Sequence, residues 1–186
     1  MKGKLEIYCG GMFAEKSTNL LRQAKRHMLA GRKVVIIKPD IDNRYAADKV
    51  VTHDGSELAA VVLNTSTRMS FRKYLKIKQS DVVLIDEVQF FEEHVIRLVN
   101  DLLEEGKTVY AAGLDMDKEG KPFEITSHLM AIAEEVHKVK AVCRDCGNDS
   151  WVTVETKKQE GRVNIGNDYK PVCRSCSYNY IGTKNA

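Results

Sequence analysis

The chain has 186 residues, enough for one domain and a small additional unit. Hydrophobic residues make up 43%, which argues against disorder, and the net charge of +3 is too small to favour nucleic acid as a partner. No apolar run approaches the roughly 18–20 residues of a membrane span, and the first residues do not resemble a signal peptide. We therefore expect a cytoplasmic protein with neither a membrane nor a nucleic-acid partner.

The stretch from Gly10 to Ser17 is organised like a phosphate-binding loop. It follows a short apolar run, residues 5–9, and precedes apolar residues at helical spacing that predict a helix from about Ser17 to Gly31. In such a loop, backbone N–H groups and the positive end of the helix dipole bind phosphate oxygens. The layout of strand, loop, Lys-Ser and helix therefore predicts a phosphate site.

One residue departs from the pattern G-x-x-x-x-G-K-[ST], because Glu15 stands where the second glycine belongs. Glycine at this place permits a positive φ or a close approach to phosphate, and a strained non-glycine residue costs of order 1–3 kcal/mol. A carboxylate beside a triphosphate also repels it, unless the side chain points outward or pairs with a basic neighbour. The sequence therefore leaves open whether Glu15 weakens phosphate binding or abolishes it.

A second strand is predicted over residues 34–37, a β-branched run typical of a strand buried on both faces. The polar loop after it contains Asp42 and Arg44. Because open α/β sheets bind ligands at the carboxyl ends of their strands, these two residues are candidates for metal or phosphate contacts. A salt bridge within the loop is an equally good interpretation.

The rest of the first 141 residues alternates between strands and helices. Strands are predicted over residues 50–52, 58–63, 82–85, 108–113 and 136–141, and helices over 94–105 and 126–135. This alternation predicts an α/β fold with a mostly parallel sheet flanked by helices.

Two adjacent acids, Asp86 and Glu87, end the strand over residues 82–85. In P-loop enzymes an acid at the end of a neighbouring strand holds the Mg²⁺ that is bound to the phosphates. Adjacent side chains of an extended chain point to opposite sides, so one acid can face the metal and the other the substrate. Together with the loop, the pair favours phosphoryl transfer, although ATPases also use such pairs.

Four of the five cysteines form two Cys-x-x-Cys pairs, Cys143 with Cys146 and Cys173 with Cys176. Four thiolates complete a tetrahedral zinc site and leave no position for substrate, which predicts structural zinc. An iron–sulfur cluster and a zinc ribbon that binds nucleic acid are the alternatives. In the segment between the pairs, Tyr169 follows a Gly- and Asn-containing turn and is a candidate contact for a flat ligand.

The order of these parts resembles the zinc-containing, cellular-type (type II) thymidine kinase family along nearly the whole chain. The resemblance is carried by Gly10–Ser17, Lys38–Pro39 with Asp42-x-Arg44-Tyr45, Asp86-Glu87-x-Gln89-Phe90-Phe91, Ala112–Asp115, Pro122–Phe123 and the two cysteine pairs. It implies a RecA-like P-loop domain over residues 1–141 and a zinc-ribbon or lasso domain over residues 142–186 that covers the nucleoside.

The resemblance also implies an activity: transfer of the γ-phosphate of ATP to the 5′-hydroxyl of thymidine, which gives dTMP for DNA synthesis. It implies Mg²⁺ with ATP, structural Zn²⁺, a homotetramer, and feedback inhibition by dTTP.

The family's site residues map onto this chain position by position. Glu87 would be the general base, Lys16 would neutralise the β- and γ-phosphates, and Arg44 would stabilise the transferred phosphate. The residues implied to bind ATP and Mg²⁺ are Gly10, Gly11, Met12, Phe13, Ala14, Glu15, Lys16, Ser17, Asp42, Arg44, Asp86 and Gln89. Those implied to bind the nucleoside are Met12, Phe90, Leu114, Lys118, Val163, Asn164, Ile165, Gly166 and Tyr169.

The chain departs from the family at three places. Glu15 replaces a loop glycine, Lys118 stands where relatives often carry an aromatic residue or a histidine, and residues 165–169 are a residue or two shorter than the usual lasso turn. Two alternative functions therefore remain. One is an impaired or inactive relative that only binds nucleotide, and the other is a P-loop ATPase whose zinc ribbon binds nucleic acid.

Overall fold

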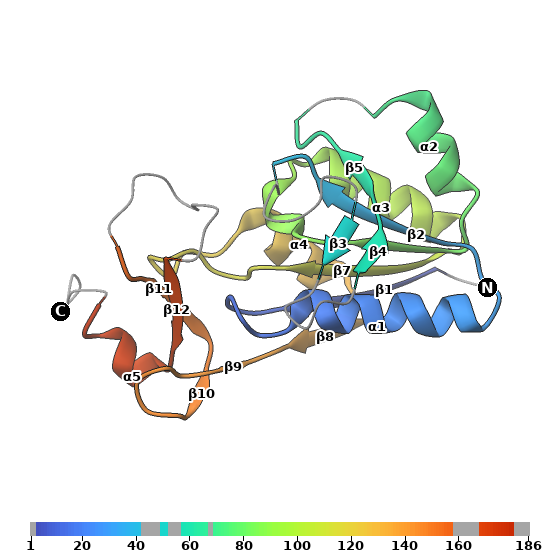
Figure 1. Ribbon diagram of the computed structural model, residues 1–186. Helices are drawn as coiled ribbons and strands as arrows, with labels where there is room; N and C mark the ends of the chain where they lie inside the picture. The colour runs from blue at the N-terminus through green and yellow to red at the C-terminus, as the bar shows by residue number, and fades with distance from the viewer. Residues whose placement is uncertain (1–2, 42–48, 52–56, 67–68, 158–167, 181–186) are drawn as a thin grey trace.

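The computed structural model describes residues 3–41, 49–51, 57–66, 69–157 and 168–180. Within these ranges a six-stranded parallel sheet forms the centre of the molecule (Figure 1). Its strand order is β5 (Val61–Leu63), β2 (Val34–Pro39), β6 (Val82–Ile85), β7 (Thr108–Gly113), β1 (Lys4–Cys9) and β8 (Glu135–Lys138). Every neighbouring pair is parallel, which confirms the predicted α/β sheet and brings all carboxyl ends to one edge.

Strand β7 lies between the strand that carries the phosphate loop and the strand that carries the two acids. Cys9 of β1 is opposite Gly113 of β7, and Ile85 of β6 is opposite Ala111 of β7. The expectation that the acids end a strand adjacent to β1 is therefore wrong by one strand.

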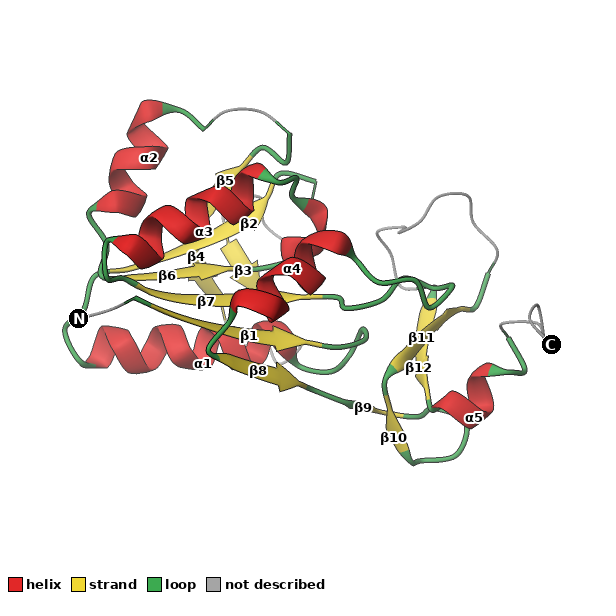
Figure 2. Ribbon diagram, turned by 180° about the vertical axis from the view of Figure 1, so that it is seen from behind, coloured by secondary structure: helices red, strands yellow, loops and turns green. Residues whose placement is uncertain are grey.

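Helices cover both faces of the sheet, and the strand sequences explain why (Figure 2). Val109 and Ala111 of β7 face the core that holds α2 (Phe71–Lys78), α3 (His94–Glu104) and α4 (Glu124–Ile132). Tyr110 and Ala112 face α1 (Lys16–Leu29) on the other side. Since successive strand residues point to opposite faces and both faces are buried, these strands read as continuous apolar runs.

Two predicted strands are each divided in the structure. The single strand expected over residues 58–63 is two: β4 (Glu57–Ala59) pairs antiparallel with β3 (Lys49–Val51), and β5 joins β2 in the main sheet. The strand expected over residues 136–141 is also divided into two strands, β8 and β9 (Ala141–Val142). Apolar patterning shows that residues are extended and buried, but it does not show where a strand changes its partner.

Short antiparallel pairs form the C-terminal part, which lies beyond one end of the sheet (Figure 1). β9 pairs with β10 (Asp149–Ser150), and β11 (Val152–Glu155) pairs with β12 (Tyr169–Val172), which leads into α5 (Arg174–Ser177). Val154 and Val172 pack with Cys143 in a small apolar cluster of its own. Such a small core gains stability from a metal or another cross-link.

None of the helices in the ranges described above is both long enough and apolar enough to cross a bilayer.

Candidate active site and metal centre

The phosphate loop, residues 10–15, joins β1 to α1 and packs against the C-terminal part. Gly10 has a φ of 147°, and a Cβ there would lie 2.3 Å from the carbonyl oxygen of Val139. A Cβ on Gly11 would lie 2.9 Å from Oγ1 of Thr153 on β11. Both glycines are therefore required by the close approach of residues far along the chain, apart from any need to approach phosphate.

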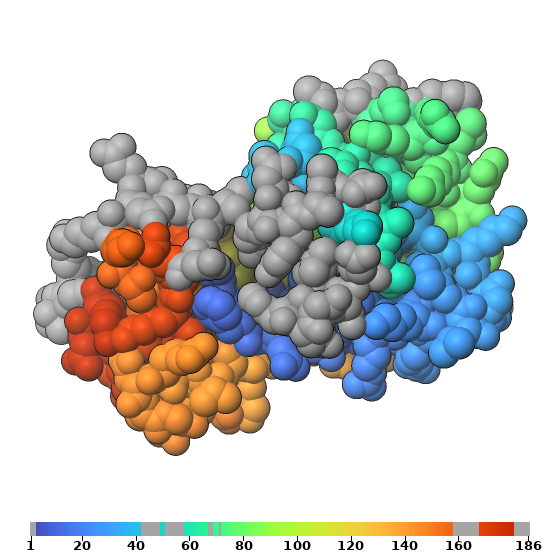
Figure 3. Space-filling model, viewed as in Figure 1, coloured from blue at the N-terminus to red at the C-terminus, as the bar shows by residue number. Residues whose placement is uncertain are grey.

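The same contact is visible on the molecular surface, where the blue N-terminal loop meets the orange and red C-terminal part (Figure 3). The Met12 N–H donates to Oγ1 of Thr153 at 2.9 Å, and Nζ of Lys16 crosses the loop to donate to the Gly11 carbonyl at 2.6 Å. Thr153 was missed in the sequence because a contact across 141 positions leaves no local pattern.

Ser17 and Asp86, the residues expected to hold Mg²⁺, lie together. Ser17 is in the first turn of α1, and its hydroxyl donates to Oδ1 of Asp86 at 3.1 Å. Asp86 is buried directly after β6. Because α1 begins near the carboxyl end of β1, the two side chains meet although β7 lies between their strands. Together they present a hydroxyl and a carboxylate, which suit Mg²⁺.

Glu87 does not continue the strand as expected. Its φ of 52° and ψ of 46° are left-handed, and it begins the short 3₁₀ helix η1 (Val88–Phe90). The two acids thus separate at a sharp turn after Ile85 instead of alternating along an extended chain. The Glu87 N–H donates to Oδ1 of Asp86 at 3.0 Å, so the turn is held by the acid before it.

Gln89 and Leu114 extend the hydrogen-bond network that begins with Ser17, Asp86 and Glu87. Nε2 of Gln89 donates to Oε2 of Glu87 at 2.5 Å, and its Oε1 accepts from the Leu114 N–H at 3.0 Å. Gln89 and Leu114 are both buried, whereas Phe90 on η1 is partly exposed. The structure therefore brings Ser17, Asp86, Glu87, Gln89 and Leu114 into one connected network at the carboxyl ends of β6 and β7.

Tyr169 and Lys118 come together at the end of β11. Tyr169 is buried at the start of β12, opposite Glu155. Nζ of Lys118 donates to Oε1 of Glu155 at 2.7 Å, a hydrogen bond that raises the pKa of the lysine. The ion pair between Lys118 and Glu155 ties the loop after β7 to the C-terminal part, a role that the sequence did not indicate.

Asp115 is a further buried acid at this edge of the sheet. It follows Leu114, and one of its oxygens lies 3.1 Å from the ammonium of Lys138 on β8. The sequence identified Asp115 only as part of a motif, because its burial depends on the pairing of distant strands.

Six of the predicted site residues lie outside the described residues: Asp42, Arg44, Val163, Asn164, Ile165 and Gly166. Their roles stay predictions.

Glu15 occupies the conformation expected for a glycine. Its φ of 57° and ψ of 29° are left-handed, its side chain is exposed, and its carbonyl oxygen accepts the N–H of Asn19 at 3.0 Å. A left-handed residue that carries a Cβ costs roughly 1–2 kcal/mol. The energetic cost of Glu15 therefore comes from its left-handed backbone conformation. Its carboxylate lies at the surface, where its charge is screened.

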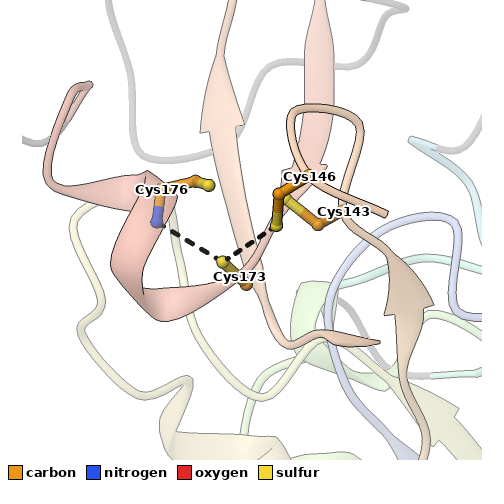
Figure 4. Close-up of side chains that lie close together, drawn as sticks. All are labelled: Cys143, Cys146, Cys173 and Cys176. Atoms are coloured by element: carbon orange, nitrogen blue, oxygen red, sulfur yellow. Dashed lines mark hydrogen bonds between the residues drawn. The ribbon is translucent and has the colours of Figure 1, made fainter. Parts of the chain in front are cut away.

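The four cysteines of the two pairs meet in one cluster (Figure 4). All four Sγ atoms lie within 4.8 Å of one another, and those of Cys146 and Cys173 are 3.7 Å apart. The edge of a sulfur tetrahedron with Zn–S bonds of about 2.3 Å is about 3.8 Å. Donor type, number and spacing therefore fit a structural zinc ion.

The thiols of this cluster differ in acidity. Burial opposes ionisation of Cys143, but backbone N–H groups, the first of them that of Cys173, outweigh it and lower its pKa to about 6. Hydrogen bonds with Cys173 and Cys146 raise the pKa of Cys176 to about 12. One negative charge is thus easily placed here, and further thiolates require a cation to offset their repulsion.

Comparison with known proteins agrees with this geometry. The family model described as "TK: Thymidine kinase" matches residues 3–177. The chain belongs to the thymidine kinase family. A protein named thymidine kinase from Pseudothermotoga lettingae is 38% identical over 188 residues, which span the whole of both chains. Another from Bacteroides thetaiotaomicron is 40% identical over 177 residues, which cover 94% of this chain and 87% of that protein.

Replacing Glu15 by glycine should stabilise this thymidine kinase family member. Relief of the left-handed backbone outweighs the entropy cost of glycine and should raise the free energy of unfolding by about 1 kcal/mol. Urea denaturation measures this change. In the matched control Arg22→Gly, at an exposed position inside α1, glycine should instead destabilise by about 1 kcal/mol. A loss of stability in Glu15→Gly would contradict the assignment of strain to this residue.

The cysteine cluster should bind about one zinc ion per chain. Metal analysis of purified Cys143→Ser should find no zinc, and hydrogen exchange should show lost protection from β9 to α5. Cys9→Ala is the control, because Cys9 is a buried cysteine of the main core and lies outside the cluster. A Cys143→Ser protein that retains full zinc, or a Cys9→Ala protein that loses it, would refute the site.

Proposed function

We propose that this protein transfers the γ-phosphate of ATP to the 5′-hydroxyl of thymidine and releases dTMP, a salvage step for DNA synthesis. The observation that carries the proposal is the match of nearly the whole chain to the thymidine kinase family. The contact of Ser17 with Asp86 beside Glu87 supports it, because phosphoryl transfer requires bound phosphates, charge neutralisation and an oriented nucleophile.

In this proposal the donor phosphates bind in the loop over residues 10–17. Backbone N–H groups and the N-terminus of α1 would bind phosphate oxygens. Lys16, whose ammonium donates to the Gly11 carbonyl, would turn to the β- and γ-phosphates when ATP is bound. Ser17 and Asp86 would hold Mg²⁺, which neutralises phosphate charge.

Glu87 is the proposed general base. Its left-handed turn follows β6 directly, and its backbone N–H donates to Asp86, one of the residues assigned to Mg²⁺, which supports this role. Glu87 would accept the proton of the thymidine 5′-hydroxyl as that oxygen attacks the γ-phosphorus. Arg44 would stabilise the charge on the transferred group.

The nucleoside would lie between the main sheet and the C-terminal part. Met12, Phe90, Leu114 and Tyr169 would line its pocket, with Lys118 beside it, and backbone groups of residues 163–166 would contact the edge of the base. An apolar pocket for the 5-methyl group distinguishes thymidine from deoxyuridine by only about 1–3 kcal/mol. We accordingly divide the chain into a catalytic domain over residues 1–141 and a nucleoside-covering zinc domain over 142–186.

The proposal extends to assembly, regulation and place of action. We propose a homotetramer that acts in the cytoplasm and is inhibited by dTTP, the triphosphate of the substrate nucleoside. Light scattering during gel filtration tests the tetramer, and turnover in the presence of added dTTP tests the inhibition.

The decisive experiment mixes the zinc-loaded protein with Mg²⁺, ATP and thymidine and measures dTMP by chromatography. We expect dTMP to form in step with ADP. One outcome would show that the protein is an impaired relative: no dTMP forms, ATP binds weakly, and Glu15→Gly restores both ATP binding and dTMP formation. If no dTMP forms but nucleic acid stimulates ATP hydrolysis, the ATPase alternative replaces the kinase proposal.

Replacing Glu87 by glutamine should lower kcat by about 10²–10⁴-fold, the contribution typical of a general base. The affinity for ATP should stay within about threefold, since the amide keeps the size of the side chain and the phosphate contacts are elsewhere. Stopped assays and equilibrium binding measure the two effects. Glu92→Gln, an exposed position just after η1, should leave both unchanged. Full turnover in Glu87→Gln would require another base.

A further inference from the structure

Gln89 links the proposed base to the loop that follows β7. It is 8% exposed, and both ends of its amide are used within the protein, by Glu87 on one side and Leu114 on the other. The resemblance assigned Gln89 to ATP and Mg²⁺, but its two hydrogen bonds connect it to the base and to a residue of the proposed nucleoside pocket. We propose that Gln89 is a positioning residue that sets the orientation of Glu87, an inference that rests on the proposed function.

The orientation of the Gln89 amide follows from its neighbours. A backbone N–H can only donate, so the Leu114 N–H requires the amide oxygen on its side. The NH₂ group must then face Glu87, and it donates to Oε2 at 2.5 Å. A flipped amide would place oxygen against carboxylate and NH₂ against N–H, two repulsive contacts at once. The arrangement is therefore self-consistent only when Glu87 offers an acceptor to Gln89.

The space around Gln89 holds the amide in this position. A Cβ at Gly113 would lie 2.8 Å from Oε1 of Gln89 and 2.5 Å from Cγ2 of Val88. Glycine at the end of β7 therefore lets η1 pack directly against the strand. With η1 seated this way, the left-handed backbone of Glu87 is held by contacts on both sides, which is how a strained residue is kept in a single conformation.

The hydrogen bond has a chemical consequence for a general base. A donor to one carboxylate oxygen fixes the plane of the group and so the direction of the other oxygen. Without this donor, Glu87 would be less well aimed at the hydroxyl that it is proposed to deprotonate.

Two substitutions separate this role from simple packing. Gln89→Met keeps the approximate volume and removes both hydrogen bonds. Gln89→Glu keeps the shape and the acceptor for Leu114 but places a second carboxylate against Glu87. The matched control is Gln23→Met, which removes another buried amide, one that donates to Tyr8 at 2.8 Å on the α1 side of the sheet.

We expect Gln89→Met to lower kcat about 10–100-fold, with the KM for thymidine within about threefold. The loss of kcat should be at least as large in Gln89→Glu, where like charges push the Glu87 carboxylate away from its position. Gln23→Met should keep kcat within about threefold of the wild-type value even where its melting temperature falls. A kcat within about threefold of wild type in both Gln89 variants, or a rise in KM that accounts for the whole loss of kcat/KM, would overturn the proposal.

A readout that does not depend on turnover keeps this test apart from the proposed function. Crystal structures of the wild-type protein, Gln89→Met and Gln23→Met would show the direction of the Glu87 carboxylate. We expect the carboxylate to leave its wild-type direction in Gln89→Met and to keep it in Gln23→Met. If wild-type protein forms no dTMP, the proposed function fails, while the crystal structures still decide whether Gln89 orients Glu87. An unchanged carboxylate direction in Gln89→Met refutes the positioning role even in an active kinase.

Discussion

Parallel pairing of β1, β7 and β6 is the constraint from which the site follows. Because all three strands run in the same direction, the phosphate loop after β1, the acids after β6 and Leu114 after β7 emerge at one edge. An antiparallel strand at any of these places would send its loop to the opposite edge. The hydroxyl of Ser17 reaches Asp86 although β7 lies between their two strands.

The residues with positive φ outside glycine gather at this edge. In the described ranges they are Phe13, Glu15 and Glu87, two in the phosphate loop and one at the proposed base. Each costs of order 1–3 kcal/mol and persists only where its surroundings leave no alternative. Strand β6, with four residues of zero exposure, gives Glu87 such a fixed support. The strain is therefore placed where side-chain direction matters for chemistry.

Local patterns made most of the fold and the metal centre predictable. Apolar runs located β1, β2, β6 and β7, and the Cys-x-x-Cys spacing located the cluster, because four soft ligands in two close pairs have few other uses. The break after Ala59 and the position of β7 between β1 and β6 were not predictable, since pairing partners are set by distant residues. The same holds for Thr153 and for the amide of Gln89, whose roles depend on contacts that exist only after the sheet has formed.

The contact between the phosphate loop and β11 connects the two ends of the chain. Thr153 accepts the N–H of Met12, and the absence of a Cβ on Gly11 lets β11 approach the loop. β11 is in turn paired with β12, which leads directly to Cys173 and Cys176. An ion that binds the cysteines therefore also restrains the strand that contacts the phosphate loop. Since Met12 belongs both to the loop and to the proposed nucleoside pocket, a zinc ion at the cysteines would support the proposed donor and acceptor sides through the same strand, without taking part in the chemistry.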